Sequence, residues 1–361
     1  MKRKQVAISR IVPGMVTANA VYTEDNHLVI PKNYVLTPRA IERLEFYYVK
    51  NIDVLFSEEL SDILFDDTDT SSYLERIRRS DEYKLFYKSY KKSILNVKST
   101  LNRVVTNNDV IDTDELIEDV DRVLVTCNNG YHIFDLLQCI RNFDDQTYVH
   151  SLNVALICNV FGNWLKLSSE DLRVLTLSGL LHDIGKLVIP AEILKKPGKL
   201  TESEFRAIKH HPISGYNLLD AKDLDERVML TALMHHERCD KSGYPNGLDR
   251  NQISDFGKIV AIADVYDAMT SNRVYREALC PFYVIEIFEQ EGLLKYDPNF
   301  LLVFLERIAE TYIHSTVRLN NNLLGEVIML NIHSLSKPII RIGDKFFDLS
   351  KDHKLVIEAL V

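Results

Sequence analysis

The 361 residues are enough for one large domain with appendages or for two to three modules. Hydrophobic residues make up 46% and charged residues 26% of the chain, which is ordinary for a globular protein. The formal net charge of −9 argues against a DNA-binding protein, because duplex binding needs a basic surface. It does not exclude a small anionic substrate, since bound metal ions can reverse the local field.

The cysteines and the start of the chain narrow the class of protein further. Five cysteines, an odd number with no Cys-x-x-Cys pair, argue against a disulfide framework and against a structural zinc site. Arg10 interrupts the first apolar stretch too early for a signal peptide, and no apolar run approaches the ~20 residues of a membrane span. We therefore expect a cytoplasmic protein that has no membrane partner.

The first two of four predicted regions precede the histidine-rich part of the chain. Residues 1–57 are predicted to form a small α+β module, with short strands, a helix that begins at Thr37-Pro38, and the closing strand "IDVLF". Residues 58–142 begin with the acidic linker "SEELSDILFDDTDTSS" and continue at helical spacing from residue 74, which predicts two or three helices. Their role is either connection or dimerisation, and a homodimer through these helices is one expectation.

The third region, residues 143–315, is predicted to be helical, and the fourth, residues 316–361, to be a small β tail. Ser168 opens one helix, the capping box Thr201-x-x-Glu204 opens another, and a third apolar helix begins near Ile259. The tail alternates like strands around Asn-rich and Gly-Asp turns. The predicted fold class is therefore mainly α, with a small α+β module before the helices and a small β tail after them.

Six of the eleven histidines fall between residues 150 and 236, each at or near the end of a predicted helix. Two stand alone: His150 begins one helix, and His182 ends another together with Asp183. Gly185 is the expected C′ residue of the latter helix. The other histidines form two pairs, His210–His211 and His235–His236. The first pair closes a helix with Ile208 and Phe205 on the inner face, and Asp264 lies inside an unusually apolar helix.

Each of these groups alone is compatible with an ordinary core residue that makes its own hydrogen bonds. Burying all of them unpaired in one helical core would cost on the order of several kcal/mol per group. One shared cation removes this cost at every position at the same time. Imidazole and carboxylate donors without thiolate suit Fe, Mn, Co, Ni or Zn. The adjacent His182 and Asp183 fit a two-metal centre, in which a carboxylate bridges both ions.

The ordered motifs "HDIGK", "HHERCDKSGYP" and "IADVYDAMTSNRVYR" resemble the HD-GYP family of cyclic di-GMP phosphodiesterases, a branch of the HD-domain metal-dependent phosphohydrolases. The resemblance covers about residues 143–285 and implies an HD-type helical bundle that carries two divalent transition metal ions, Fe or Mn first. It implies bacterial second-messenger signalling with cyclic di-GMP as substrate. The implied metal ligands are His150, His182, Asp183, His211, His235, His236 and Asp264. His210 is the spare of its pair, because the family's ligand directly precedes proline.

The resemblance also implies residues that act on the substrate. Asp183 is expected to bridge the ions, Lys186 to contact phosphate or the leaving oxygen, and Asp267 to orient a ligand or the attacking water. The alternative for Lys186 and Asp267 is a solvated helix charge. The expected substrate-binding residues are Lys186, Gly243, Tyr244, Pro245, Asp267, Arg273 and Arg276. Tyr244 could stack on a base or be an ordinary turn residue, and the arginines suit phosphate or guanine.

Three positions depart from the family pattern. Lys241 stands where glycine is common, and Cys239 where an aromatic or aliphatic residue is usual, so affinity rather than activity is in question. Gln146 stands four residues before His150, where members with a third ion have glutamate. We therefore expect two metals and a linear dinucleotide, pGpG, as the main product. The alternatives are a non-catalytic cyclic-dinucleotide receptor, an HD phosphohydrolase of another nucleotide, and a purely structural scaffold.

Overall fold

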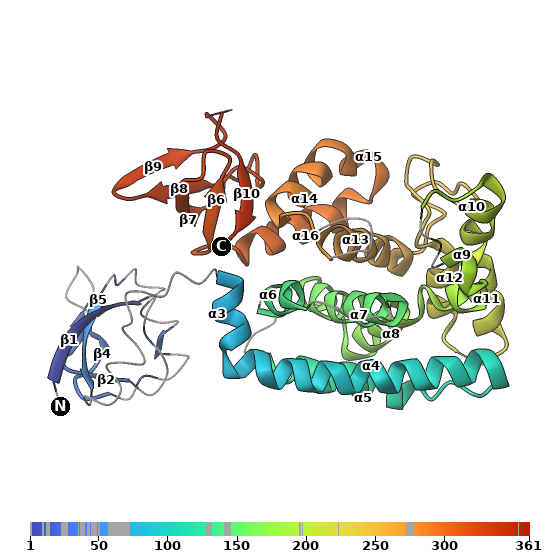
Figure 1. The fold of residues 1–361 in the computed structure, drawn as a ribbon, viewed down its shortest axis with the longest axis horizontal. Coiled ribbons are helices and arrows are strands. Elements are labelled where there is room, and N and C mark those ends of the chain that lie inside the picture. Colours follow the sequence, from blue (N-terminus) through green and yellow to red (C-terminus); the bar gives the residue numbers. More distant parts are fainter. Residues whose placement is uncertain are drawn as a thin grey trace. The chain divides into compact units, whose positions relative to one another are not determined.

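The structure, a computed structural model, describes residues 2–8, 11, 15–22, 28–34, 36, 40–41, 44, 49, 51–56, 73–127, 132–140, 146–194, 196, 198–222, 224–271, 278–352 and 354–361. The chain divides into two compact units, residues 1–70 and 71–361. The second unit contains the helical region together with the preceding helices and the β tail (Figure 1).

The first unit is built around a small antiparallel sheet of order β1-β5-β2, formed by β1 (Lys2–Ala7), β5 (Asn51–Phe56) and β2 (Val16–Thr17). A second pair joins β3 (Val21–Tyr22) to β4 (Leu28–Ile30). The predicted closing strand "IDVLF" is confirmed as β5, whose Ile52 and Val54 are buried. Most of the predicted helix after Thr37 and all of the acidic linker after residue 56 lie outside the described residues.

The described part of the segment between the first unit and the histidine-rich region has four helices rather than the predicted two or three: α3 (Tyr73–Arg79), α4 (Asp81–Asn107), α5 (Thr113–Leu124) and α6 (His132–Cys139). The count differs because Ser80 caps α4 by accepting the N–H of Tyr83, which splits a continuous helical pattern into α3 and α4. The inner face of α4 is buried against the core, with Phe86 and Tyr90 among its members.

The histidine-rich region folds around α7 (Gln146–Trp164), which contacts α4 on one side and α13 (Asp255–Thr270) on another (Figure 1). The helices α8 (Ser169–Leu181), α11 (His211–Asp220) and α12 (Glu226–Met234) complete this core. Short segments join them, namely η2 (Ile184–Val188), α9 (Ala191–Leu194) and α10 (Glu202–Lys209). Both α7 and α13 bury residues around most of their circumference, as helices in the middle of a bundle do.

Local predictions for these helices are confirmed in part. Ser168 caps α8, and Thr201 with Glu204 forms the expected capping box of α10. The helix that carries Asp264 starts at Asp255 after the N-cap Ser254, earlier than the predicted Ile259, because its first turn is more polar than the rest. Phe205 was expected to point inward but is 50% exposed, since α10 lies at the edge of the bundle and buries none of its residues.

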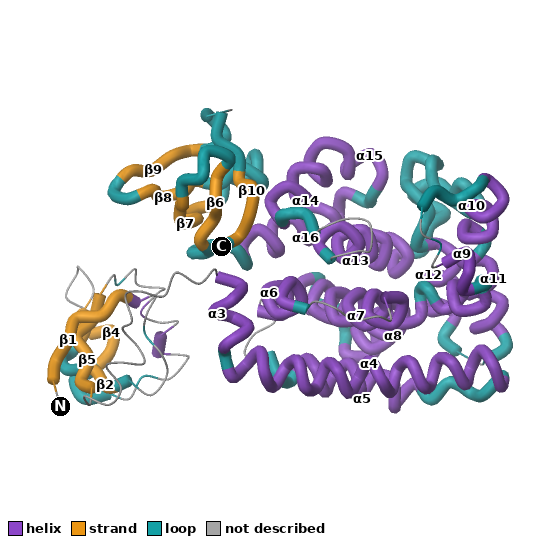
Figure 2. The backbone as a smooth tube through the Cα atoms, in the orientation of Figure 1, coloured by secondary structure: helices purple, strands orange, loops and turns teal. Residues whose placement is uncertain are grey.

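The second unit ends in three helices and the predicted β tail. The helices are α14 (Pro281–Ile287), followed by the π-helical turn η3 (Phe288–Gly292), then α15 (Leu293–Lys295) and α16 (Pro298–Glu310). The tail is an antiparallel sheet of order β10-β6-β7-β8-β9 (Figure 2). Its strands are β6 (Thr316–Leu319), β7 (Leu324–Met329), β8 (Ile339–Ile342), β9 (Lys345–Asp348) and β10 (Ile357–Leu360).

The sheet shares the hydrophobic core of the helices through residues such as Val317, Val327 and Ile340, all fully buried. The prediction of a mainly α fold with an N-terminal α+β module and a C-terminal β tail is therefore confirmed at the level of its architecture. Among the helices within the described residues, none combines the length and the apolar character that crossing a bilayer requires.

Candidate metal centre

Seven side chains of the histidine-rich region gather in two neighbouring groups that could each hold a metal ion. They come from the ends of α8, α11 and α12 and from within α7 and α13, segments that are far apart in the sequence. The first group contains Asp183, His211, His235 and His236, and the second contains His150, His182 and Asp264. These are the seven residues proposed as ligands from the sequence, whereas the spare His210 is exposed.

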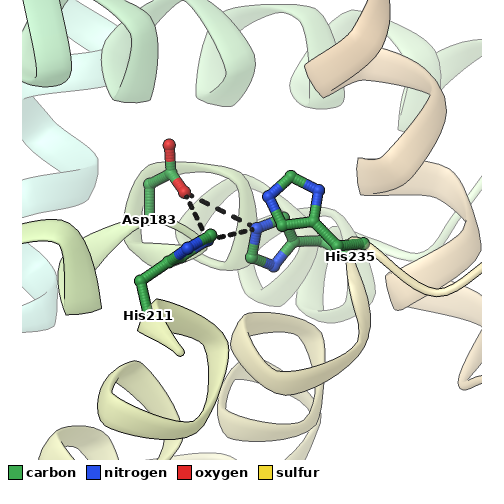
Figure 3. Close-up of side chains that lie close together, drawn as sticks. Asp183, His211 and His235 are labelled. Atoms are coloured by element: carbon green, nitrogen blue, oxygen red, sulfur yellow. Dashed lines mark hydrogen bonds and ion pairs between the residues drawn. The ribbon is translucent and has the colours of Figure 1, made fainter. Parts of the chain in front are cut away.

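Asp183 lies between the two groups and faces each with a different oxygen. Its Oδ1 lies 3.1 Å from Nε2 of His211 and 3.5 Å from Nε2 of His235, as Figure 3 shows. Its Oδ2 lies 3.6 Å from Nε2 of His150 and 3.5 Å from Nε2 of His182. A carboxylate in this position can bind one ion with each oxygen, which is the geometry of a bridge in a two-metal site.

Four of the five histidines in these groups have the other ring nitrogen, Nδ1, fixed by an acceptor. Nδ1 donates to the carbonyl of Gly179 in His182, of Ile208 in His211 and of Ala232 in His235, at 2.7, 2.7 and 2.9 Å. In His150 it donates to Asp267 at 2.6 Å. When Nδ1 carries the proton, the neutral ring presents an Nε2 lone pair, so each acceptor orients its ring for metal binding.

In the first group, this protonation of Nδ1 leaves no proton between the Nε2 lone pairs of His211 and His235. Nε2 of His211 lies 3.2 Å from Nε2 of His235, and both also face the carboxylate of Asp183. In the second group Nε2 of His182 is buried and, among the described residues, has no hydrogen-bond partner. Electron pairs that converge in a buried space repel one another unless a cation lies between them, so the donor set fits divalent metal.

The ionisation of the cluster follows from burial and from its opposite charges. Burial alone would lower the pKa of His150, but hydrogen bonds to Asp264 and Asp267 outweigh it and raise the pKa to about 9. Burial lowers the pKa of His235 to about 4. Burial alone would raise the pKa of Asp183, yet Lys186 and His182 hold it well below its usual range. The apoprotein is therefore expected to have an ionised Asp183 and a neutral His235 at neutral pH.

Asp267 lies one helical turn after Asp264, and its carboxylate contacts His150 instead of being solvated. Its Oδ2 accepts from Nδ1 of His150 at 2.6 Å, while its Oδ1 accepts from Nδ2 of Asn153 and Oγ of Ser271, both at 2.8 Å. Both oxygens are thus engaged, and the side chain is almost fully buried. The geometry favours the role of orienting a ligand over that of holding the attacking water or the substrate.

Gly185 and Lys186 come shortly after Asp183, the proposed bridging carboxylate, in the sequence. Nζ of Lys186 forms an ion pair with Oδ2 of Asp183, so the ammonium lies beside the cluster rather than in bulk solvent. Gly185 was predicted as the C′ residue of α8, and this is wrong, because α8 ends at Leu181 with His182 as its C-cap and the chain passes into η2 without a positive φ at Gly185. Instead, a Cβ at Gly185 would overlap the carbonyl of His211, so glycine permits η2 and α11 to approach closely.

The Gly243-Tyr244-Pro245 turn folds back onto the two histidines that precede it. The Tyr244–Pro245 peptide is cis, and the Tyr244 ring stacks on His236 with centroids 4.6 Å apart and planes inclined by 30°. A Cβ at Gly243 would overlap the backbone of residues 236–238, which explains glycine there. Tyr244 thus packs against a candidate ligand, and Nζ of Lys209 lies over the Tyr244 ring, 4.9 Å from its centroid.

Glu237 was not proposed from the sequence, yet it holds this turn in place. Its carboxylate is buried and accepts the backbone N–H of Asn246 at 2.7 Å and that of Leu248 at 2.9 Å. A glutamate directly after two ligand histidines and before a Gly-Tyr-Pro turn was the available signal, because a buried carboxylate needs donors nearby. The proposed Arg273 and Arg276 lie outside the described residues.

Comparisons with known proteins show to which class of domain this region is similar. Residues 137–300 match the model of the HD domain family. A cyclic di-GMP phosphodiesterase, PA4108 of Pseudomonas aeruginosa, is 35% identical over 234 residues, which are 64% of this chain and 56% of that protein. The 3′3′-cGAMP-specific phosphodiesterase 1 of Vibrio cholerae is 43% identical over 145 residues, 40% of this chain and 34% of that protein. The chain thus spans about half or less of these relatives.

A solved structure shares the fold. Bd1817, an HDG"Y"P protein from Bdellovibrio bacteriovorus, aligns with a TM-score of 0.51 and 16% identity, covering 85% of this chain and 99% of that one. The fold and the His/Asp donor set define an HD domain. Within that class, the ordered motifs of this region resemble those of the HD-GYP family.

Proposed function

We propose that this protein is a metal-dependent phosphodiesterase that hydrolyses cyclic di-GMP, mainly to the linear dinucleotide pGpG, in bacterial second-messenger signalling. The observation that carries the proposal is the position of Asp183, whose two oxygens face two separate groups of histidines. The names of the relatives support the substrate, because PA4108 is a cyclic di-GMP phosphodiesterase.

Two divalent transition metal ions, Fe or Mn, would be held by the seven side chains of the two groups, with Asp183 shared between them. When bound, such ions supply a hydroxide nucleophile near neutral pH and neutralise charge on the phosphate oxygens. The protein's own part is to fix the donors: the Nδ1 acceptors orient the imidazoles, and Asp267 holds the ring of His150.

Lys186 is proposed to act on the substrate directly. Its ammonium pairs with Oδ2 of Asp183 and so lies next to the candidate metal centre. An ammonium in that position can donate to a phosphate oxygen or to the leaving oxygen as charge develops there. Tyr244, Gly243 and Pro245 form the wall beside His236, and we propose Arg273 and Arg276 as further phosphate or guanine contacts.

The experiment that tests this function compares Asp183→Ala and Asp183→Asn with the wild-type protein, purified anaerobically and loaded with Mn²⁺ or Fe²⁺. We expect wild type to bind metal and to release pGpG, and Asp183→Ala to lose turnover together with bound metal. Asp183→Asn keeps the shape but not the charge and should be nearly as inactive. Near-normal hydrolysis by Asp183→Ala would contradict the role of Asp183 as a bridging ligand. Absence of metal from the wild-type protein would favour the alternative of a purely structural scaffold.

A second substrate is favoured by a specific observation. A relative with 43% identity over 145 residues is named a 3′3′-cGAMP-specific phosphodiesterase. The two cyclic dinucleotides share the phosphodiester and differ in one base, so the metal centre does not distinguish them, whereas base contacts would. Parallel measurement of kcat/KM on cyclic di-GMP and 3′3′-cGAMP decides the preference, and binding of either without hydrolysis would favour the non-catalytic receptor.

We also propose a cytoplasmic homodimer assembled through the connecting helices. Leu85 and Leu95 of α4 are 55% and 58% exposed, and Val110, after the end of α4, is 81% exposed. Apolar side chains on the outer side of a long helix support a contact with a second copy. Light scattering of wild type and of a Leu85→Lys/Leu95→Lys variant tests it, with loss of the dimer in the variant as the expected result.

A further inference from the structure

A chain of buried hydrogen bonds joins the long helix α4 to the candidate ligand His150. The hydroxyl of Tyr90, on α4, lies 2.5 Å from Oδ1 of Asn153 on α7. Nδ2 of Asn153 donates to Oδ1 of Asp267 on α13 at 2.8 Å, and Oδ2 of Asp267 accepts from Nδ1 of His150 at 2.6 Å. Tyr90 is fully buried, and Asn153 and Asp267 are nearly so.

The direction of each hydrogen bond is fixed by the chemistry of its partners. A carboxylate only accepts, so Asn153 must present its NH₂ group to Asp267. The amide oxygen then points at Tyr90 and accepts the hydroxyl proton. Without that hydroxyl, the amide oxygen loses the donor that helps to keep the NH₂ group turned toward Asp267, so the amide is held less firmly.

We propose that Tyr90 and Asn153 are positioning residues that set the orientation of His150 through Asp267, and that α4 thereby helps to set the metal affinity of the group formed by His150, His182 and Asp264. The inference rests on the metal binding in the proposed function. It goes beyond it by assigning a role at the centre to a helix that supplies no ligand. Residues that orient a ligand from behind commonly change metal affinity by roughly 10- to 100-fold.

The chain offers a matched control for Tyr90. Tyr148, on α7, also makes a hydrogen bond between these two helices, from its hydroxyl to Oδ1 of Asn102 on α4 at 2.7 Å. Tyr148 is buried as well, but it is not part of the chain that reaches Asp267. Tyr90→Phe and Tyr148→Phe therefore each remove one hydroxyl that forms a hydrogen bond between α4 and α7. Only Tyr90→Phe should change the orientation of His150.

The test is Mn²⁺ binding to the full chain in the absence of nucleotide, measured by titration calorimetry, with thermal unfolding of the apoproteins alongside. We expect Tyr90→Phe to weaken one of the bound Mn²⁺ equivalents by about 2- to 10-fold, the value of one buried hydrogen bond. Tyr148→Phe should bind Mn²⁺ like wild type although its unfolding temperature falls by a similar amount. Asp267→Asn should weaken binding more, and adding Tyr90→Phe to it should have no further effect.

Wild-type Mn²⁺ affinity in Tyr90→Phe, or equal weakening in Tyr90→Phe and Tyr148→Phe, would overturn the inference. A further loss in the double variant Tyr90→Phe/Asp267→Asn would do the same, since it would show that Tyr90 acts by another route. Failure of the wild-type protein to bind Mn²⁺ would instead refute the proposed function itself. Binding without hydrolysis of cyclic dinucleotides leaves the positioning role supported while the proposed enzymatic activity fails.

Discussion

Tyr244 stacks on His236, with the two ring centroids 4.6 Å apart, because the seven residues between them fold the chain back on itself. The contact covers one face of a candidate metal ligand with an aromatic ring. It also explains why two adjacent histidines can serve one centre: α12 ends at Met234, so His235 points inward from the helix end while His236 is held by the returning turn.

The stacking predicts different results for two substitutions of Tyr244. Tyr244→Phe keeps the ring and should retain metal affinity and kcat, whereas Tyr244→Ala should weaken metal binding by about 2- to 10-fold, as expected for one aromatic contact. Calorimetric titration with Mn²⁺ measures the metal affinity of both variants, and steady-state kinetics measures their kcat. Equal damage in both variants would mean that the hydroxyl, not the ring, is what the site uses.

Glu237 should control the turn without controlling the metal. Glu237→Gln replaces one of two acceptor oxygens by a donor, which leaves a backbone N–H of Asn246 or Leu248 unpaired. We expect a loss of about 1–3 kcal/mol in the free energy of unfolding and a raised KM for the dinucleotide, with unchanged metal content. Chemical denaturation, kinetics and elemental analysis of one preparation check all three, and loss of metal would contradict this division of roles.

Gln146 permits a test of the expected two-metal stoichiometry. It is the first residue of α7, lies one turn before His150, and is exposed. Gln146→Glu places a carboxylate beside His150 and should raise the metal content above that of wild type. Thr147→Glu adds the same charge but points about 100° away around the helix, so it should leave the content unchanged. A wild type that already holds three ions per chain would show the prediction of two to be wrong.

Arg273 and Arg276 lie outside the described residues, so their role as substrate contacts remains a prediction from the sequence. Ala substitution at either position should raise KM roughly 10-fold or more, the range for a lost charged hydrogen bond, without altering metal content. Arg318→Ala, on the β tail, is the control and should change neither quantity. Loss of metal in Arg273→Ala or Arg276→Ala would show that these residues support the fold of the site instead.

The candidate site was largely predictable from the sequence because its donors carry strong local signals. Histidines and aspartates at the ends of apolar helices are unusual, and the structure brings all seven proposed ligands within two groups. The helix caps at Ser168 and Thr201 could also be predicted from the sequence, since capping depends on residues within one turn. What the sequence could not supply were contacts made between segments that are distant along the chain.

Gly185, Glu237 and Asp267 illustrate this limit. Gly185 was predicted to end a helix, but its reason is the backbone of His211, which only the folded chain brings near. Glu237 acquires its function from a turn that returns nine to eleven residues later. The two roles left open for Asp267 could be weighed only once Asn153, Ser271 and His150 were seen around its oxygens.

The spacing of the ligands along the chain has a consequence for folding. His150 and Asp264 are separated by 114 residues, yet their side chains meet at 2.9 Å. An ion held there would close a loop of that length, as a reversible cross-link between α7 and α13, and long loops are the ones whose closure restricts the unfolded chain most. Metal supply would then determine not only turnover but also how long the folded chain survives heat and proteases, since ligands that bind only the native state stabilise it.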